Sequence, residues 1–476
     1  MDETGGAYFL ALGGGNEIGK KCLLLAFPRE QVAVIVDVGV KMLPKSDNPD
    51  NLAIPDLKAL KPVLGPGWKI YLVITHAHAD HALLGPLLKN LYPELMALAT
   101  AKTLGVFAVM GEDGIKIREE AGLPAHYSRN ELGEFLDSAY PIRSTDWKEL
   151  ERGFAVRFIP AGHIQGAASV LIKTPYGIFA DSGDISFFDT TTTKGASLEL
   201  EDRIRWLSIE STNGDINLEN PKQVLDELVK DVFRVIQRGG NVLIPAFAVG
   251  RGLDVGIHLG RELAKHRIPV YSGGLLRKAT EACCNHSWES DLPFKHGYHK
   301  DYKNQDVFDL CNENIYWVHG QNLDCVAYQK KKCVVVIPSG MLEAGYSQGF
   351  LYAWANDPRN AIFLPGYQAK GTLGRQLLET NSGGELAIYF PMSGLSKIVK
   401  IRAEVKRYQL SGHAGSNQLA EWIGNMRPQN GKSLDKVILV HGEEIGQAAL
   451  GEKLRALPKA PKQVLVGVNG QVIPLL

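Results

Sequence analysis

The chain has 476 residues, too many for one hydrophobic core of ordinary size, so we expect two or three domains. Lysine plus arginine equals aspartate plus glutamate at 52 each, so a polyanion would have to bind in a local groove and not to a charged surface as a whole. No stretch approaches about 18 unbroken apolar residues, and residues 1–3 lack the order of a signal peptide, which predicts a cytoplasmic protein without a membrane segment.

Six cysteines are present, and five of them lie between residues 283 and 333 together with four histidines. This grouping would suit an accessory zinc site, but no two of these cysteines have the C-x-x-C spacing of structural zinc sites. In a cytoplasmic protein we expect reduced, partly buried thiols instead.

The first predicted elements are strands. Apolar residues 8–12 run into the glycine-rich stretch 13–19, a second apolar run covers 22–27, and a third covers 32–38 and contains Asp37. A glycine loop after a strand can bind a dinucleotide, but here the glycine spacing differs from that fingerprint and no helical pattern follows. The pattern therefore predicts a tight turn between strands of a meander.

Three histidines and an aspartate then stand within six residues, namely His76, His78, Asp80 and His81. Alternate residues of a strand share a face, so His76 and His78 point the same way, whereas Asp80 and His81 fall on the turn into the next helix. Imidazole with carboxylate suits zinc, with iron or manganese as alternatives, and two such ions can activate water. A chance run of surface histidines is disfavoured, because the chain has only 13 histidines.

Three more candidate residues follow short apolar strands. His163 comes after the strand at 154–159, Asp184 comes after the strand at 178–180, and Glu210 closes the last strand of this first region. Because a sheet presents functional side chains where its strands end, we expect His163 and Asp184 to join the histidine cluster, although either residue without that cluster would more often be structural.

In residues 215–395 the spacing of apolar residues changes. Helical spacing at 224–236 is followed by a buried strand at 241–247 and a second helix at 253–263, and the alternation continues. It predicts a small parallel α/β domain. Residues 283–330 show no clear period, and no element is predicted there.

From residue 396 the strand pattern resumes, with basic residues interleaved at 397–407. Two further histidines, His413 and His441, follow strands in this tail. We therefore expect the tail to fold back onto the first region, which divides the chain into 1–214, an insertion at 215–395, and the return of the first domain at 396–476.

These motifs resemble the metallo-β-lactamase superfamily and, within it, the β-CASP nucleases, which include RNase J and the cleavage-and-polyadenylation endonucleases. The superfamily motif H-x-H-x-D-H is matched by residues 76–81, and its later histidine and aspartate by His163 and Asp184. The β-CASP motifs E-S-T, S-G/A-H-A and V-H-G-E are matched by residues that include Glu210, His413 and His441. Over nearly the whole chain, the resemblance implies an αββα sandwich with an inserted parallel α/β domain.

The resemblance also implies the metal ligands and their roles. One ion would be held by His76, His78 and His163, the other by Asp80, His81 and His441, and Asp184 would bridge them. Two zinc ions, with manganese as an alternative, would activate water for attack on phosphorus. Besides Asp80, the catalytic residues would be His413, which would protonate the leaving oxygen, and Glu210, which would orient His413 and raise its pKa.

For the substrate, glycine-flanked Arg251 and Arg375 are the candidates for binding phosphate in the cleft between the domains, with Ser411 and Ser339 in neighbouring loops. The basic strand at 397–407 could meet phosphates too, although a solvated charged face explains it almost as well.

The expected activity is metal-dependent hydrolysis of single-stranded RNA. The alternatives are a DNA-directed nuclease of the same family, a non-catalytic scaffold subunit of a nucleic-acid-processing or defence complex, and a small-substrate hydrolase. Ser-Gly-His-Ala is typical of RNase J, whereas Gly-Tyr-Gln is typical of the polyadenylation branch, so the subfamily stays open. Endonucleolytic and 5′–3′ exonucleolytic cleavage also stay open, as do a homodimer and a protein partner.

Overall fold

Two β-sheets packed face to face form the larger part of the molecule. The computed structural model describes residues 6–43, 52–284, 315–318, 320–327, 332–390 and 395–476. The first sheet has the strand order β25 (Val472–Pro474), β1 (Tyr8–Gly13), β2 (Cys22–Phe27), β3 (Val32–Val36), β6 (Lys69–Ile74), β7 (Met96–Thr100) and β8 (Tyr140–Ile142). The second has the order β24 (Gln463–Val466), β23 (Lys436–Val440), β13 (Arg203–Glu210), β12 (Gly177–Asp181), β11 (Ala168–Thr174), β10 (Ala155–Pro160) and β9 (Lys148–Glu149), with β22 (Arg427–Pro428) also paired to β13.

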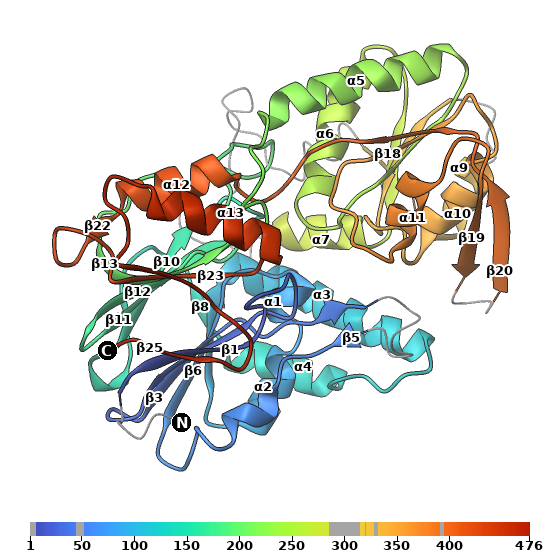
Figure 1. Ribbon diagram of the computed structural model, residues 1–476. Coiled ribbons are helices and arrows are strands. Elements are labelled where there is room, and N and C mark those ends of the chain that lie inside the picture. The colour runs from blue at the N-terminus through green and yellow to red at the C-terminus, as the bar shows by residue number, and fades with distance from the viewer. Residues whose placement is uncertain (1–5, 44–51, 285–314, 319, 328–331, 391–394) are drawn as a thin grey trace.

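Aromatic and branched side chains from both sheets fill the space between them. Phe9 of β1 stacks on Phe179 of β12 with ring centroids 6.3 Å apart, and Trp206 of β13 is fully buried in the same cluster. Helices cover the outer faces of the sandwich (Figure 1). They are α1 (Ala79–Ala82), α2 (Gly85–Leu91), α3 (Ala101–Glu120) and α4 (Arg129–Ser138) beside the first sheet, and α12 (Ser416–Asn425) and α13 (Glu444–Arg455) beside the second. Short elements complete this part: β4 (Lys41–Met42), β5 (Leu52–Ala53), and two 3₁₀ turns at Leu57–Leu60 and Glu151–Gly153.

The glycine-rich stretch after β1 is a turn between antiparallel strands, as predicted, since β1 pairs with β2. Its glycines allow the returning tail to approach closely. A Cβ on Gly15 would lie 1.7 Å from the carbonyl oxygen of Gly467, and the backbone N–H of His441 donates to the carbonyl oxygen of Gly14. The stretch therefore packs the chain around a candidate metal ligand.

The insertion is built on a six-stranded parallel sheet. Its order is β16 (Tyr316–Val318), β15 (Val270–Gly273), β17 (Val334–Ile337), β14 (Val242–Pro245), β18 (Ala361–Leu364) and β21 (Glu404–Arg407). Its helices are α5 (Pro221–Gln237), α6 (Arg251–Ala264), α7 (Leu275–Cys284), α9 (Gly320–Ala327), α10 (Tyr346–Trp354) and α11 (Leu373–Glu379), and a hairpin of β19 (Glu385–Phe390) and β20 (Leu395–Lys400) lies at its far end (Figure 1). The predicted sandwich with a parallel α/β insertion is confirmed.

Strand pairing favours a later end of the insertion than the boundary expected at residue 396. β21 pairs in parallel with β18, and β20 pairs with β19, so both strands hydrogen-bond to strands of the expected insertion. A short strand of basic residues has the same sequence pattern whichever sheet it joins. The pattern therefore could not separate the insertion from the returning domain. We propose that the return of the first domain begins after β21, near residue 408.

The tail completes the second sheet. β23 lies parallel to β13 with Val440 opposite Glu210, and β24 lies parallel to β23. This register places His441 beside the end of β13. Within the described residues, no helix is both long and apolar enough to cross a bilayer. Cys22, Cys283 and Cys333 are buried, and a zinc site that used Cys311 falls outside the described residues.

Asp231 ties α5 to the edge strand of the insertion. It accepts hydrogen bonds from Nζ of Lys406 and from the hydroxyl of Tyr408, both at 2.6 Å, and from Arg234 at 2.9 Å. Burial raises the pKa of Asp231, but these donors outweigh burial and lower the pKa to about 2. The stabilisation that ionised Asp231 contributes to the folded state is therefore complete above the pKa of about 3.9 that it has in the unfolded chain. It is lost as the pH falls through the pKa of Asp231 in the folded protein.

We expect Asp231→Asn to lower the free energy of unfolding at pH 7 by about 1 kcal/mol, the usual scale for partly exposed charged pairs. Urea unfolding followed by circular dichroism between pH 7 and pH 3 measures the difference between variant and wild type, which should shrink at the acid end. Asp226→Asn is the matched control, because Asp226 lies on the same helix and its side chain is 54% exposed. A difference for Asp231→Asn that stays constant over this pH range would contradict the assignment.

Candidate active site

The candidate residues gather at one edge of the sandwich, where strands of both sheets end. β6 leads through Thr75 into the histidine cluster, and the mutually parallel strands β12, β13 and β23 lead to Asp184, Glu210 and His441. Parallel strands end at the same edge, so residues far apart in the sequence meet there. The structure brings together all seven predicted metal ligands and places the pair of His413 and Glu210 beside them.

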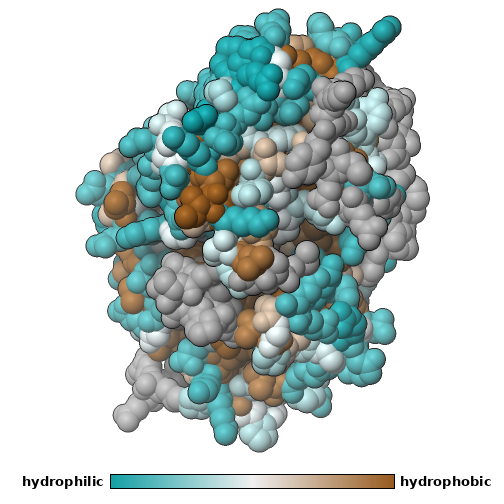
Figure 2. Space-filling model, turned by 90° about the vertical axis from the view of Figure 1, so that its right-hand side faces the viewer, coloured by the Kyte–Doolittle hydropathy of each residue, from teal (hydrophilic) through white to brown (hydrophobic). Residues whose placement is uncertain are grey.

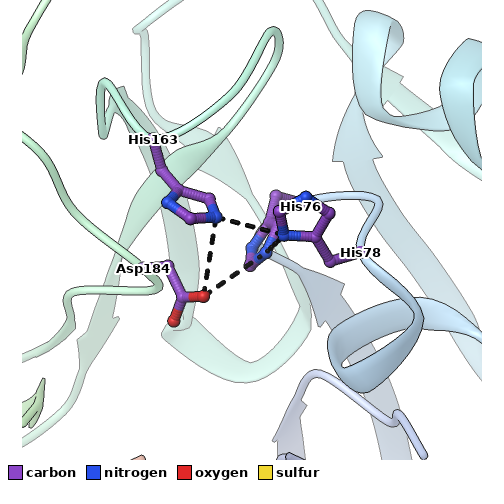
Figure 3. A group of neighbouring side chains, drawn as sticks. All are labelled: His76, His78, His163 and Asp184. Atoms are coloured by element: carbon purple, nitrogen blue, oxygen red, sulfur yellow. Dashed lines mark hydrogen bonds and ion pairs between the residues drawn. The ribbon is translucent and has the colours of Figure 1, made fainter. Parts of the chain in front are cut away.

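The first group of candidate ligands contains His76, His78, His163 and Asp184 (Figure 3). Nε2 of His76 and Nε2 of His163 each lie 3.1 Å from Nδ1 of His78. The same two atoms lie 3.6 and 3.7 Å from Oδ2 of Asp184. Ligands bound to a tetrahedral zinc ion at its usual distances stand roughly 3.3–3.6 Å apart, so this spacing fits one ion.

Asp80, His81 and His441 form the second group. Oδ2 of Asp80 lies 3.3 Å from Nε2 of His441 and 3.9 Å from Nε2 of His81. Asp184 faces this group as well, since its Oδ2 lies 3.3 Å from Nε2 of His81 and its Oδ1 lies 3.5 Å from Nδ1 of His441. One carboxylate therefore contacts both groups and is placed where two ions could share it.

Hydrogen bonds on the outer side of two imidazoles leave lone pairs facing the centre. Nδ1 of His163 donates to the carbonyl oxygen of Gly412 at 2.7 Å, and Nδ1 of His81 donates to Oδ2 of Asp37 at 2.8 Å. In the neutral rings the Nε2 atoms are then unprotonated. Among the described residues, Nε2 of His81 and Oδ1 of Asp184 are buried without a hydrogen-bond partner. Converging lone pairs repel one another, so this donor set fits divalent cations such as zinc or manganese.

Burial and neighbouring charges set the protonation states. Burial lowers the pKa values of His76 and His163 well below the usual range, which keeps both rings in the neutral form that binds metal. Burial opposes ionisation of Asp184, but His81 and other imidazoles outweigh it and hold the pKa of this carboxyl well below its usual range. Burial also lowers the pKa of His81, yet the surrounding carboxylates raise it well above the usual value. A metal ion entering the site would displace that proton, so metal affinity should fall with falling pH.

A buried ionic layer lies beneath the metal ligands. Oδ1 and Oδ2 of Asp37 accept from the backbone N–H and hydroxyl of Thr75, and Oδ2 also holds His81. Nζ of Lys21 lies 3.2 Å from Asp37 and 2.7 Å from Asp181, and its side chain is 1% exposed. Sequence reasoning missed Lys21, because one lysine next to an apolar strand carries no motif. Its role is visible only in the strand pairing that buries it.

His413 and Glu210 form a hydrogen-bonded pair at the edge of the centre. Nδ1 of His413 donates to Oε2 of Glu210 at 2.7 Å, and the backbone N–H of Ile185 donates to the other carboxylate oxygen at 2.7 Å. Glu210 also comes within ligand reach of Asp184 and His441. Because both of its oxygens already accept hydrogen bonds, Glu210 is better placed to orient His413 than to bind a metal.

The charges around His413 favour its protonated form. Burial lowers its pKa, but Glu210 and then Asp184 outweigh burial and raise the pKa to about 9. Nε2 of the ring is left free to act, because Nδ1 is committed to Glu210. An imidazolium held in this way can donate a proton at neutral pH.

Two of the predicted substrate-binding residues lie beside the metal ligands. Arg251 begins α6, and a Cβ on Gly412 would lie 3.8 Å from its Nε and 3.0 Å from Nδ1 of His163. Ser411 lies in the same loop, where its hydroxyl oxygen accepts from the backbone N–H of His413 at 3.1 Å. Ser411 therefore also shapes the turn that presents His413.

The other two predicted substrate-binding residues have local partners within the insertion. Nε of Arg375 donates to Glu379 at 2.6 Å on the exposed side of α11. The hydroxyl oxygen of Ser339 accepts from the backbone N–H of Glu343 in the turn after β17. No hydrogen bond or ion pair within the described part of the chain joins either side chain to the metal-ligand groups.

The basic segment at 397–407, expected as one strand, is divided between β20 and β21, and its lysines interact with residues of the insertion. Lys406 forms ion pairs with Glu227 and Asp231, both at 2.6 Å, and Nζ of Lys397 lies 5.0 Å from the ring centroid of Tyr352. The surface of the insertion on this side is mostly hydrophilic with separate hydrophobic patches (Figure 2). A solvated, ion-paired face therefore explains this basic segment better than contact with phosphates beside the metal centre.

The centre is largely closed, which defines how a substrate can approach. The side chains of His81, Asp184 and His441 are at most 2% exposed, whereas those of Asp80 and His413 are 32% and 20% exposed. The centre is therefore most accessible from the side on which Asp80 and His413 lie.

The sandwich, the two ligand groups at its edge and the parallel insertion together define a metallo-β-lactamase fold of the β-CASP type. Two family models match the chain: the Beta-Casp domain over residues 257–377 and the Zn-dependent metallo-hydrolase RNA specificity domain over residues 398–464. The chain belongs to the β-CASP family of metallo-β-lactamase-fold proteins.

Similar proteins include archaeal enzymes and termination factors. RNase aCSPSF2 of Saccharolobus solfataricus is 29% identical, with 98% of this chain and 85% of that protein covered. Probable RNase MJ4 of Methanocaldococcus jannaschii is also 29% identical, with 93% and 98% covered. Transcription termination factor FttA of Methanosarcina mazei is 28% identical, and the alignment covers 91% of this chain and 66% of that factor.

One solved structure shares the fold over almost the full length of both chains. It is a protein of unknown function from Enterococcus faecalis V583, with a TM-score of 0.58, 13% sequence identity, and coverage of 98% of this chain and 99% of that one. At this level of identity the likeness concerns the fold alone.

Proposed function

We propose that the protein is a ribonuclease that hydrolyses phosphodiester bonds in single-stranded RNA with the help of two metal ions. The observation that carries the proposal is the juxtaposition of the two ligand groups with the hydrogen-bonded pair of His413 and Glu210. The names of RNase aCSPSF2 and Probable RNase MJ4, which align along most of this chain, favour RNA as the substrate.

The residues of the two groups divide the work of metal binding. His76, His78 and His163 would hold one ion, Asp80, His81 and His441 would hold the other, and Asp184 would contact both. Zinc or manganese in these positions supplies Lewis acidity and lowers the pKa of water. Asp37 and the carbonyl oxygen of Gly412 fix the ring orientation of His81 and His163, which keeps the ligand atoms aimed at the centre.

Hydrolysis of a phosphodiester also requires a proton for the leaving 3′-oxygen. His413 is the candidate donor, because it is protonated at neutral pH, lies 3.8 Å from Asp184, and borders the open side of the centre. Glu210 holds Nδ1 of His413 and thereby turns Nε2 toward the substrate.

A paired digestion tests the substrate class. Purified protein with zinc or manganese is incubated with 5′-labelled and 3′-labelled single-stranded RNA and with a DNA of the same sequence. We expect cleavage of RNA in preference to DNA, and the two labels distinguish internal cuts from stepwise removal of nucleotides.

An Asp80→Ala/His81→Ala double variant serves as the control, because it removes two ligands of the second group. Wild-type protein that contains metal yet cleaves neither label would overturn the proposal. Cleavage of DNA alone would replace RNA by DNA as the substrate.

A further inference from the structure

Arg251 stands where the insertion meets the metal-binding domain. It is the first residue of α6, which follows Gly250, and a Cβ on Gly250 would lie 2.6 Å from Cγ2 of Ile164. Gly412 separates the guanidinium from the ring of His163, since a Cβ there would lie within 3.8 Å of Arg251 and 3.0 Å of His163. The absence of side chains at both glycines is what brings Arg251 close to a metal-ligand ring.

One edge of the guanidinium is fixed by the protein. Nη1 of Arg251 donates to Oδ2 of Asp254 at 3.2 Å. Oδ1 of Asp254 accepts from the backbone N–H and hydroxyl of Thr192, at 3.0 and 2.8 Å. Asp254, itself a residue of the insertion, is thus anchored to Thr192 of the metal-binding domain while it holds Arg251.

The other edge of the guanidinium has no partner. The Arg251 side chain is 11% exposed, and its Nε and Nη2 atoms are buried without a hydrogen-bond acceptor among the described residues. Leaving charged donors buried and unpaired is costly, so such an edge is normally matched by an anion or water. Nε and Nη2 together form the planar fork that binds two oxygens of a phosphate or carboxylate.

We propose that the Nε and Nη2 edge of Arg251 binds the non-bridging oxygens of a phosphodiester in the nucleic acid held at the metal centre, with Asp254 as the residue that positions it. The inference deepens the proposed function and rests on it for the substrate class. A phosphodiester fits because its oxygens match the fork, and the neighbouring centre is built to receive the same polymer. This arginine is then a point at which the insertion itself contributes to substrate binding.

Equilibrium binding separates this proposal from a purely structural role. Fluorescence anisotropy measures the affinity of a labelled 12-nucleotide single-stranded RNA for His413→Gln protein, in which cleavage is slowed, with and without Arg251→Gln. We expect Arg251→Gln to weaken binding about 10- to 100-fold and to reduce the slope of log affinity against log salt by about one phosphate contact. Arg251→Lys should lose affinity but keep most of the salt slope, since lysine keeps the charge without the fork.

Arg375→Gln is the matched control, because Arg375 is exposed and already paired with Glu379, and it should change affinity less than Arg251→Gln. Equal melting temperatures and equal metal content confirm that the variants are folded. If Arg251→Gln is unstable, the comparison is made with Arg251→Lys.

Unchanged affinity and salt slope in both Arg251 variants would overturn the proposal. If the protein binds RNA through Arg251 but does not cleave it, the proposed phosphate contact stands and the proposed nuclease activity is overturned. RNA cleavage by Arg251→Gln with an unchanged Michaelis constant would overturn the proposed phosphate contact and leave the proposed nuclease standing.

Discussion

Asp184→Ala is expected to abolish cleavage and to remove bound metal, with a loss of activity of more than about a thousandfold. Asp184 contacts both ligand groups, with its carboxylate oxygens 3.3 to 3.7 Å from nitrogens of four histidines. Without it, the imidazoles lose the negative charge that would balance two cations. Inductively coupled plasma mass spectrometry on dialysed protein measures metal per chain, and the rate of RNA cleavage is measured on the same samples.

The control for this variant is Asp189→Asn, which changes an exposed carboxylate five residues away that accepts from the backbone N–H of Gly195. It should keep wild-type metal content and activity. Two bound ions and normal cleavage in Asp184→Ala would show that Asp184 is not a shared ligand.

His413→Gln should slow RNA cleavage by about a hundredfold to ten-thousandfold, the range for losing a general acid or base. The decisive comparison uses bis-p-nitrophenyl phosphate, whose leaving group departs without a proton. With that substrate the variant should lose much less activity, whereas a general structural defect would reduce both rates alike. Metal content should remain that of the wild type.

The pH dependence gives an independent check. His413 must be protonated to act, so activity depends on the form present below its pKa and falls as the pH rises through that pKa. Glu210 raises the pKa of His413, and Glu210→Gln should therefore move the alkaline fall in activity to lower pH. A profile whose alkaline limb stays in place in Glu210→Gln would argue that His413 is not the acid.

The general plan of the molecule was predictable because it depends on local patterns. The six-residue histidine cluster, the single residues at strand ends and the change from strand to helix spacing are all visible in short windows of sequence. The pairing of β21 was not predictable, because its partner β18 precedes it by 43 residues, with Ala361 opposite Glu404, and the four residues of β21 do not indicate which sheet they join. The supporting lysine, Lys21, was missed for the same reason.

The predicted substrate-binding residues show where residue type alone is insufficient. Arg251 and Arg375 both stand near glycines in loops that look alike in sequence. Only in the structure does one face buried space with an unpaired edge while the other pairs with Glu379 four residues away. What separates them is the close approach of Gly250, the residue before α6, to Ile164, a long-range contact that no local pattern encodes.

The register of β23 against β13 has a consequence for the timing of folding. Asp80 and His441, which face each other at 3.3 Å, are separated by 361 positions in the chain. A nascent chain on the ribosome therefore carries the first group of ligands long before the second can form. Activity that needs both groups can begin only after β23 has been synthesised and has inserted beside β13, so the centre stays incomplete throughout the synthesis of the insertion.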